Sequence, residues 1–244
     1  MQITLVIPTY NEAENLPKLI SALFALPLDD LKVLVVDDNS PDGTGALAEE
    51  LAVLHPGQVL VRHRAGKLGL GSAYIQGFRQ ALEAGSEAVG QMDADFSHDP
   101  PALLDLLEAL RTSDVALGSR YVPGGSLDER WPFWRKGLSA FGNFYARTIL
   151  NIPIRDVTGG FRVWRRHTLL HMPLERVRSN GYSFQVEMAY VAYRLGFTFQ
   201  ETPIYFADRR WGQSKMSFRI QVEAALRVFW MRVAYRNLRA GRSN

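Results

Sequence analysis

The segment KVLVVDDNS, residues 32–40, joins a run of β-branched and aliphatic residues directly to two carboxylates, an amide and a hydroxyl. Short runs that are apolar throughout are typical of strands buried on both faces of a parallel sheet. Similar runs recur in the first half of the chain at ITLVIP (3–8), QVLVRH (58–63), EAVGQMD (87–93) and DVALGS (114–119). Segments with the character of helices separate them, near 12–26, 43–54, 70–84 and 100–110. This alternation predicts an α/β fold with a mostly parallel, doubly wound sheet.

Beyond residue 120 the regular alternation ends, and aromatic and arginine residues become frequent. The elements expected there are a helix from near Phe133, a helix near 183–195, a strand near 197–206 and a long helix from about 217 to 238. We expect a single domain over residues 1–244, in which the half 120–244 decorates the sheet built by 1–119.

The composition is that of a soluble globular protein, with 47% hydrophobic and 22% charged residues in a chain of 244. The absence of cysteine excludes disulfides, thiolate metal sites and a cysteine nucleophile. The amino-terminal run before Pro8 lacks the basic segment of a signal peptide, and no stretch reaches the roughly 20 apolar residues of a membrane-spanning helix. We therefore expect a cytoplasmic protein without a membrane span.

The net charge of +3 hides a strong asymmetry. Residues 1–119 hold 7 Lys and Arg against 17 Asp and Glu, a net charge of −10, whereas residues 120–244 hold 21 against 8, a net charge of +13. An acidic half can host a divalent cation, and a basic half attracts phosphates, nucleic acid or an anionic membrane surface. The alternative interpretation is charge that is solvated evenly over the surface.

Polar residues gather at the ends of three predicted strands, where the ligands of open α/β sheets bind. They are Pro8, Tyr10, Asn11 and Glu12 after the first strand, Asp37, Asp38, Asn39 and Ser40 after the second, and Asp93, Ala94 and Asp95 after the fourth. Asp and Asn are also common in turns and at helix starts, so a structural role is the alternative for each cluster.

Asp93 and Asp95 form the most informative pair, because side chains at i and i+2 of an extended segment project to the same side. Two carboxylates that converge repel each other unless a cation lies between them. Mg²⁺ or Mn²⁺ held by one or two carboxylates completes its coordination with water and phosphate oxygens. The pair therefore predicts a metal-bound diphosphate. We interpret the nearby His98 and Asp99 as structural, with Asp99 as the cap of a helix that begins at two prolines.

The glycine-rich segment GKLGLGS, residues 66–72, resembles strings that cradle pyrophosphates. It follows the third strand and lacks the spacing of the dinucleotide fingerprint, which argues against a dinucleotide site. A loop over a bound nucleotide, with Lys67 as an anion contact, and a plain turn both remain open.

Cationic residues form two clusters in the basic half. The first contains Arg120, Arg135, Lys136 and Ser139, and the second contains Arg209, Arg210 and Lys215. Arginine forms bidentate pairs with phosphate, so two clusters indicate two phosphate groups, although single arginines are often solvated surface charges.

The last long helix carries one apolar stripe, formed by Phe218, Val222, Leu226, Phe229 and Val233, with arginines beside it. Such a stripe either packs on its own domain or lies in a membrane interface. We favour packing on the domain.

Motifs along nearly the whole chain carry a family resemblance. They are VIPTYNEAENL (6–16), VVDDNSPDGTG (35–45), GKLGLGSAY (66–74), MDADFSHDP (92–100), LGSRYVPGG (117–125), RDVTGGFRVWRR (155–166), GYSFQVEM (181–188) and FADRRWGQSKMS (206–217). Together they resemble the family-2 nucleotide-sugar glycosyltransferases, and within them the dolichol- or polyprenol-phosphate mannose synthases. The resemblance implies a GT-A fold, an inverting transfer of mannose from GDP-mannose to a polyprenyl or dolichyl phosphate, and a divalent metal, Mg²⁺ or Mn²⁺.

The resemblance also implies roles for individual residues. Nucleotide binding would fall to Pro8, Tyr10, Glu12, Asp38, Asp93, Ala94 and Lys215. Asp93 and Asp95 would hold the metal, and Arg209 would join them in catalysis on a loop that closes over the donor phosphates. Arg120, Arg135 and Ser139 would bind the lipid phosphate.

Two departures from the family pattern matter. Ser97 stands where some relatives have a glutamine that binds the metal, and other relatives carry transmembrane helices after the catalytic domain. We therefore expect peripheral attachment to the cytoplasmic face of a membrane, or attachment through an anchoring partner protein.

Two rival functions remain open. A UDP-sugar transferase that makes glucosyl or other polyprenyl phosphates belongs to the same class. A noncatalytic module that binds nucleotides or nucleic acid would show salt-dependent, metal-independent binding. That module gives no reason for Asp93 and Asp95 to converge, so we expect no nucleic-acid partner.

Overall fold

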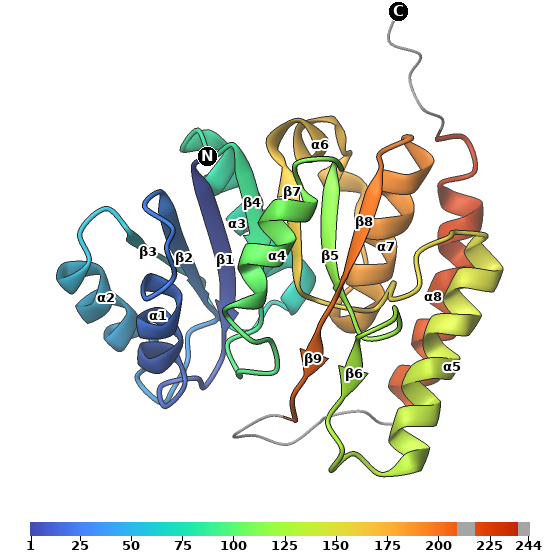
Figure 1. Ribbon diagram of the computed structural model, residues 1–244, viewed down its shortest axis with the longest axis horizontal. Coiled ribbons are helices and arrows are strands. Elements are labelled where there is room, and N and C mark those ends of the chain that lie inside the picture. The colour runs from blue at the N-terminus through green and yellow to red at the C-terminus, as the bar shows by residue number, and fades with distance from the viewer. Residues whose placement is uncertain (209–217, 239–244) are drawn as a thin grey trace, which may run out of the picture.

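In the computed structural model, which describes residues 1–208 and 218–238, seven strands form one central sheet in the order β3-β2-β1-β4-β7-β5-β8 (Figure 1). These strands are β1 (Ile3–Thr9), β2 (Leu31–Asp37), β3 (Val59–His63), β4 (Ala88–Gln91), β5 (Val115–Ser119), β7 (Arg162–Arg165) and β8 (Phe199–Pro203). Of these seven strands, only β7 runs antiparallel to its neighbours. A second sheet pairs β6 (Ser126–Leu127) with β9 (Tyr205–Phe206).

Helices cover both faces of the sheet. They are α1 (Leu16–Phe24), α2 (Thr44–Leu54), α3 (Leu70–Glu83), α4 (Ala102–Ala109), α5 (Phe133–Leu150), α6 (Arg166–His171), α7 (Gly181–Arg194) and α8 (Phe218–Ala234), with a short 3-10 helix at Leu174–Arg176. Alternate side chains of β1 enter different cores, since Leu5 packs with α1 and α4 whereas Val6 packs with α3. The predicted doubly wound layer is therefore confirmed.

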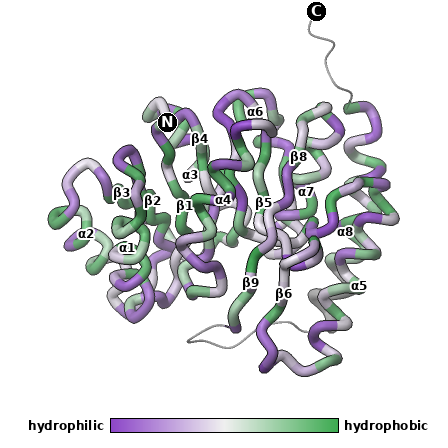
Figure 2. The backbone as a smooth tube through the Cα atoms, in the orientation of Figure 1, coloured by the Kyte–Doolittle hydropathy of each residue, from purple (hydrophilic) through white to green (hydrophobic). Residues whose placement is uncertain are grey.

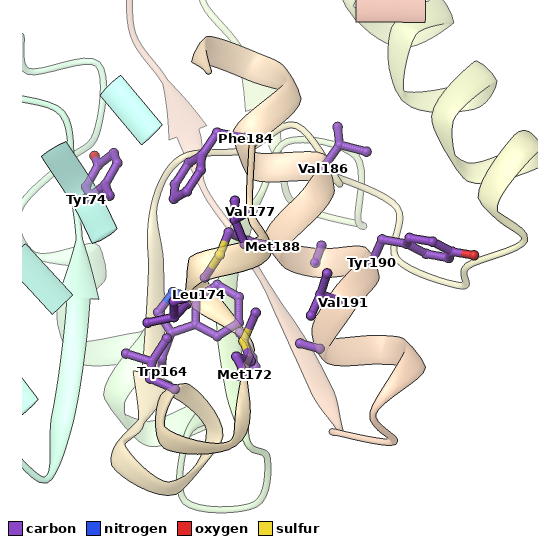
Figure 3. Close-up of a cluster of buried hydrophobic side chains, with 14 of the residues drawn as sticks. Tyr74, Trp164, Met172, Leu174, Val177, Phe184, Val186, Met188, Tyr190 and Val191 are labelled. Atoms are coloured by element: carbon purple, nitrogen blue, oxygen red, sulfur yellow. The ribbon is translucent and has the colours of Figure 1, made fainter. Parts of the chain in front are cut away.

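The core on the α3 side extends into the second half of the chain. Figure 3 shows side chains of α7, among them Phe184, Met188 and Val191, in one buried cluster with Trp164 of β7. Trp164 is fully buried, and its indole nitrogen donates a hydrogen bond of 2.9 Å to Gln91 Oε1 of β4. The two halves of the chain thus share one core across β4 and β7.

The sequence did not reveal β7, which inserts between β4 and β5. Because β7 is antiparallel to both, β4 and β5 still run parallel, and their carboxyl ends reach the same edge of the sheet (Figure 1). The strand predicted near 197–206 is divided at Ile204, since β8 extends the large sheet while β9 pairs with β6.

Two local predictions were wrong. Pro101, rather than Asp99, is the residue just before α4, and no side chain caps this helix.

The second concerns α8. Leu226, Phe229 and Val233 are exposed on this helix, although the stripe that contains them was expected to pack on the domain. Instead, Val228 and Met231 of α8 and Tyr235 just after it are buried in the core that contains α7, where Tyr235 donates a hydrogen bond of 2.6 Å to buried Glu187.

The side chains of Phe218 and Val222 lie outside the described residues. In the part of the chain that is described, no helix combines the length and the apolarity that crossing a membrane requires.

Candidate active site

The carboxyl ends of β1, β2 and β4 bring the predicted acidic residues to one edge of the sheet, as expected (Figure 1). Asn11 and Asn39 adopt left-handed backbone conformations just beyond β1 and β2, with φ of 62° and 57°. Asparagine tolerates this conformation better than most residues, which explains its place at these two sharp turns.

Asp38 is held by an arginine that the sequence analysis missed. Arg64 Nη1 lies 2.5 Å from Asp38 Oδ1 and 3.3 Å from the carbonyl oxygen of Gly69, and Nη2 donates to Ser72 Oγ at 2.5 Å. Burial raises the pKa of Asp38, and the charge of Arg64 opposes this rise. Arg64 directly follows β3, so the rule that singled out the ends of the other strands could have found it.

Three further residues predicted to bind the nucleotide, Pro8, Tyr10 and Glu12, lie at the end of β1. Pro8 is in register with Val36 of β2, and the Lys67 ammonium lies 3.8 Å from the centre of the Tyr10 ring. Glu12 accepts a hydrogen bond of 2.7 Å from Asn15 at the start of α1. The glycine-rich loop therefore folds back over the end of β1, as a loop covering a nucleotide would.

Asp93 and Asp95 follow β4, but they do not both lie on an extended segment, as the argument from positions i and i+2 assumed. The strand ends at Gln91, and Asp95 lies in a turn rather than on an extended segment. Phe96 has a φ of 58°, an uncommon conformation for a bulky residue, and the turn lets the Ser97 amide donate to Asp95 Oδ1 at 3.0 Å. Strain of this kind is often found at functional sites.

Tyr74 of α3 holds the carboxylate of Asp93 in place. Its hydroxyl donates to Asp93 Oδ1 at 3.1 Å. Burial, followed by the charge of Asp93, raises the pKa of Tyr74 well above its ordinary value, so the phenol stays protonated as a donor. The charge of Asp95 contributes to the same rise in the pKa of Tyr74.

His98 lies beside the two carboxylates and is buried between aromatic side chains. Its ring stacks on Phe161 at 5.1 Å, and its Nδ1 accepts a hydrogen bond of 3.4 Å from the Asp93 amide. Burial lowers the pKa of His98, although Asp93 and Asp95 oppose the change. The imidazole is therefore neutral at pH 7 and supplies no positive charge to the carboxylate pair.

The side chains around Asp95 fit a hard divalent cation. Asp93 and Asp95 supply carboxylate oxygens, and the Ser97 hydroxyl is 1% exposed and has no hydrogen-bond partner among the described residues. No group of three or more His, Cys, Asp or Glu side chains that could hold a metal occurs in the described part of the chain. Such a site suits Mg²⁺ or Mn²⁺, which take oxygen ligands and complete their coordination with substrate phosphates.

Arg120 reaches the site but is already paired. Its Nε and Nη2 donate to the two carboxylate oxygens of Asp156 at 2.6 and 2.7 Å, and both side chains are buried. Burial alone would lower the pKa of Arg120, but the ion pair with Asp156 raises it. The guanidinium predicted to bind the acceptor phosphate therefore faces a carboxylate of its own chain.

Arg135 and Ser139, which belong to the first cationic cluster, lie about one turn apart on α5. Arg135 stacks 3.6 Å above the Trp131 ring and pairs with Asp208 at 3.1 Å. The Tyr121 hydroxyl donates to Ser139 Oγ at 2.8 Å. Arg209, Arg210 and Lys215 lie outside the described residues.

Phe206 of β9 joins the acidic and the basic parts of the site. Its ring lies 5.4 Å from that of His98 and 5.8 Å from that of Trp131, and the Arg120 guanidinium lies 5.1 Å from its centre. The three neighbours of this ring come from three separate segments, since His98 follows β4, Arg120 follows β5 and Trp131 precedes α5.

Comparison with known proteins places the chain in a family. The family model described as Glycosyl transferase family 2 matches residues 4–171. A polyprenol monophosphomannose synthase of Mycolicibacterium smegmatis is 48% identical over 214 residues, which cover 87% of this chain and 80% of that protein. An undecaprenyl-phosphate mannosyltransferase of Micrococcus luteus is 48% identical over 229 residues, which cover 93% of each chain.

Solved structures share the fold. Glucosyl-3-phosphoglycerate synthase from Mycobacterium tuberculosis, in complex with Mn²⁺, uridine diphosphate and phosphoglyceric acid, aligns with a TM-score of 0.65 at 17% identity, covering 99% of this chain and 80% of that one. A mannosyltransferase from Pyrobaculum calidifontis, in complex with GDP-Man and Mn²⁺, aligns with a TM-score of 0.63 at 19% identity, covering 98% and 66%. The predicted GT-A fold is confirmed.

Proposed function

The chain belongs to glycosyl transferase family 2, and from this premise we propose that it transfers mannose from GDP-mannose to a polyprenyl phosphate with inversion at the sugar carbon. The observation that carries the proposal is the 48% identity, over 93% of both chains, to an undecaprenyl-phosphate mannosyltransferase. The proposed site contains an acidic part for a metal-bound donor and a cationic part for an acceptor phosphate.

The proposed reaction needs no general base from the protein. A phosphate monoester has its second pKa near 6, so its oxygen is already an anionic nucleophile at neutral pH. This oxygen attacks the anomeric carbon of mannose, a C–O bond forms, and the bond to the GDP oxygen breaks with its electron pair leaving on GDP. The protein's task is to position two anions and to stabilise the charge that develops on the leaving group.

On the donor side, Asp93 and Asp95 would hold a divalent cation, which neutralises the diphosphate when bound. Tyr74 and the Ser97 amide fix the two carboxylates through the hydrogen bonds described above. Asp38, held by Arg64, faces the nucleoside in this proposal. Tyr10 and Lys67 would cover the nucleotide on the same side of the site.

On the acceptor side, Arg135 and Ser139 would bind the lipid phosphate. Arg120, paired with buried Asp156, would fix the Tyr121 ring and, through the Tyr121 hydroxyl, the orientation of Ser139. Because the acceptor is a lipid, we place the reaction at a bilayer surface, with the chain as a peripheral protein on the cytoplasmic face.

The test offers labelled GDP-mannose and labelled UDP-glucose separately, each with polyprenyl phosphate, with and without a chelator. We expect the mannose label alone to enter the organic phase, and only when the divalent metal is available. Transfer of glucose instead would establish the rival sugar specificity, and transfer that resists the chelator would remove the metal from the mechanism.

A further inference from the structure

Glu187 of α7 is a fully buried carboxylate that the proposed mechanism does not use. The donors that reach it are the backbone amides of Arg178 and Ser179, at 3.2 and 2.7 Å, and the Tyr235 hydroxyl, at 2.6 Å. A buried carboxylate costs free energy unless hydrogen bonds compensate for the lost water. One costly side chain therefore ties the segment before α7 to the residue just after α8.

Helix α7 lies between α3 and α8 and packs against both (Figure 2). Phe184, about one turn before Glu187, stacks on Tyr74 of α3 with the ring centres 5.7 Å apart, and Figure 3 shows the two rings next to each other. Tyr74 is the residue whose hydroxyl donates to Asp93. The first turn of α7 thus packs on a helix that carries part of the candidate active site.

The segment 178–180 packs closely on the glycine-rich loop 66–72. A Cβ atom at Gly71 would lie 2.5 Å from the carbonyl oxygen of Ser179, and a Cβ atom at Gly69 would lie 2.7 Å from Asn180 Oδ1. Both distances are too short for a real Cβ contact, so glycine is what lets the two segments approach this closely. The loop therefore rests on the segment whose amides Glu187 holds.

The same loop carries contacts of the proposed nucleotide site. The carbonyl oxygen of Gly69 accepts a hydrogen bond of 3.3 Å from Arg64, the residue that pairs with Asp38. Lys67 of the loop lies over the ring of Tyr10. A shift of the segment 178–180 would therefore move the loop and, with it, the side chains assigned to the nucleotide.

We propose that Glu187 is a positioning residue for the donor nucleotide, because it fixes the segment on which the glycine-rich loop rests. The inference rests on the proposed function, which assigns this loop to the nucleotide. Glu187 acts through the backbone of Arg178 and Ser179 and touches neither substrate nor metal.

Tyr235 fixes the carboxylate itself. Its hydroxyl donates to Oε1 of Glu187, whereas the Ser179 amide donates to Oε2. Burial, followed by the hydrogen bond to Glu187, raises the pKa of Tyr235 well above its ordinary value, so the phenol stays protonated as a donor.

The alternative is a purely structural role, in which Glu187 only joins α7 to the end of α8. Loss of the carboxylate would then lower the unfolding temperature without changing how the folded protein binds nucleotide. A positioning role predicts instead a loss that is confined to the donor side, with acceptor binding unchanged.

The test compares the wild-type chain with two variants at this position. Glu187→Met has a side chain of similar length but no oxygen to accept the Ser179 amide, whereas Glu187→Gln keeps one. Thr4→Val is the matched control, since it breaks a buried hydrogen bond of 2.7 Å to Ser86 at the opposite edge of the sheet. Calorimetry below the unfolding temperature measures the binding of GDP and, separately, of UDP with Mg²⁺, and initial rates give the KM for GDP-mannose and for polyprenyl phosphate.

We expect Glu187→Met to bind the nucleotide that wild type prefers at least about tenfold more weakly, because a displaced loop misplaces its contacts. The KM for GDP-mannose should rise similarly, with the KM for polyprenyl phosphate unchanged. Glu187→Gln should recover most of the loss, and Thr4→Val should bind nucleotide as wild type does. Unchanged nucleotide binding in Glu187→Met, an equal loss in Thr4→Val, or equal losses for donor and acceptor would overturn the positioning role.

Hydrogen exchange of the wild-type protein decides the question should Glu187→Met fail to fold. Nucleotide binding should slow amide exchange in residues 66–72 and 178–180 together, and slowing in 66–72 alone would overturn the proposal. A selective loss of nucleotide binding in Glu187→Met, in a chain that transfers no mannose, would retain the positioning role and refute the proposed function.

Discussion

Asp38 and Arg64 of the acidic half meet across neighbouring parallel strands, whereas Arg120 and Asp156 of the basic half meet across a chain excursion that contains β6 and α5. In the acidic half, a repeating strand and helix unit delivers each site residue to the same edge. In the basic half, paired charges hold irregular segments in place. The difference predicts that substitutions on the acidic side mainly affect ligand binding, and that some on the basic side affect folding.

The largest effect tests the basic half. Asp156→Asn leaves the buried Arg120 guanidinium without its counter-charge, and breaking a buried pair on one side costs about 3–5 kcal/mol of unfolding free energy. Urea denaturation measures this loss. Glu108→Gln, which breaks an exposed pair with Arg111 on α4, is the control and should leave the urea midpoint unchanged. Equal midpoints for Asp156→Asn and wild type would show that the pair does not hold the basic half together.

The next effect tests the acidic half. Asp95→Asn keeps the shape of the side chain but removes a proposed metal ligand, so transfer from GDP-mannose should fall at least about a hundredfold. The unfolding temperature should change little, because the carboxamide oxygen can still accept the Ser97 amide hydrogen bond. Activity close to wild type would remove Asp95 from the metal site, and a collapse of the unfolding temperature would contradict the contrast between the halves.

A smaller expected effect, on the KM values of Arg135→Lys, distinguishes residues that bind the donor from residues that bind the acceptor. Arg135→Lys keeps the charge but loses the planar guanidinium that stacks on Trp131 and can grip two phosphate oxygens. We expect the KM for polyprenyl phosphate to rise about tenfold, equivalent to about 1.4 kcal/mol, with the KM for GDP-mannose unchanged. Arg147→Lys, further along the same helix, is the control. Equal losses for donor and acceptor would refute the assignment of Arg135 to the acceptor side.

The same contrast explains what the sequence could predict. The strands of the acidic half are signalled locally by runs such as KVLVVD, and polar residues at strand ends follow from the geometry of parallel sheets. This was enough to predict the fold class and to bring Asp38, Asp93 and Asp95 to one edge. The same rule, applied to the end of β3, could have singled out Arg64, but its partners Asp38 and Ser72 become visible only when β2, β3 and α3 are assembled.

The basic half resisted prediction because long-range contacts determine it. β7 is only four residues long and begins with Arg162, whose buried guanidinium donates to the carbonyl oxygens of Val157, Gly159 and Gln185. No local pattern reveals these partners. Similarly, the apolar stripe of α8 was expected to be buried, but the side of the helix that carries Val228 and Met231 packs inward instead. Amphipathic periodicity locates an apolar side and does not say what covers it.

The smallest effect concerns Asp114, which joins the two halves at the edge of the sheet opposite the candidate active site. Its carboxylate accepts hydrogen bonds of 2.8 and 2.7 Å from the amide and hydroxyl of Thr198, and it lies 2.9 Å from His167 Nε2. Burial alone would raise the pKa of Asp114, but these hydrogen bonds outweigh it and lower the pKa below 3.8.

A lowered pKa means that the unfolded chain binds this proton first as the pH falls. The stability from Asp114 is therefore fully present above about pH 5 and is lost as the pH falls below 3.8 toward the lower folded-state value. Asp114→Asn should lower the unfolding free energy by about 1 kcal/mol at pH 7, since the carboxylate is only partly shielded from water. The difference in unfolding free energy between Asp114→Asn and wild type should shrink as urea denaturation is repeated at decreasing pH.

Mannose transfer at pH 7 should be unaffected by Asp114→Asn, because the substitution lies at the edge of the sheet opposite the candidate active site. A stability difference that stays constant with pH would show that the charge of Asp114 does not join the halves, and a loss of transfer would show that this edge and the active site are coupled.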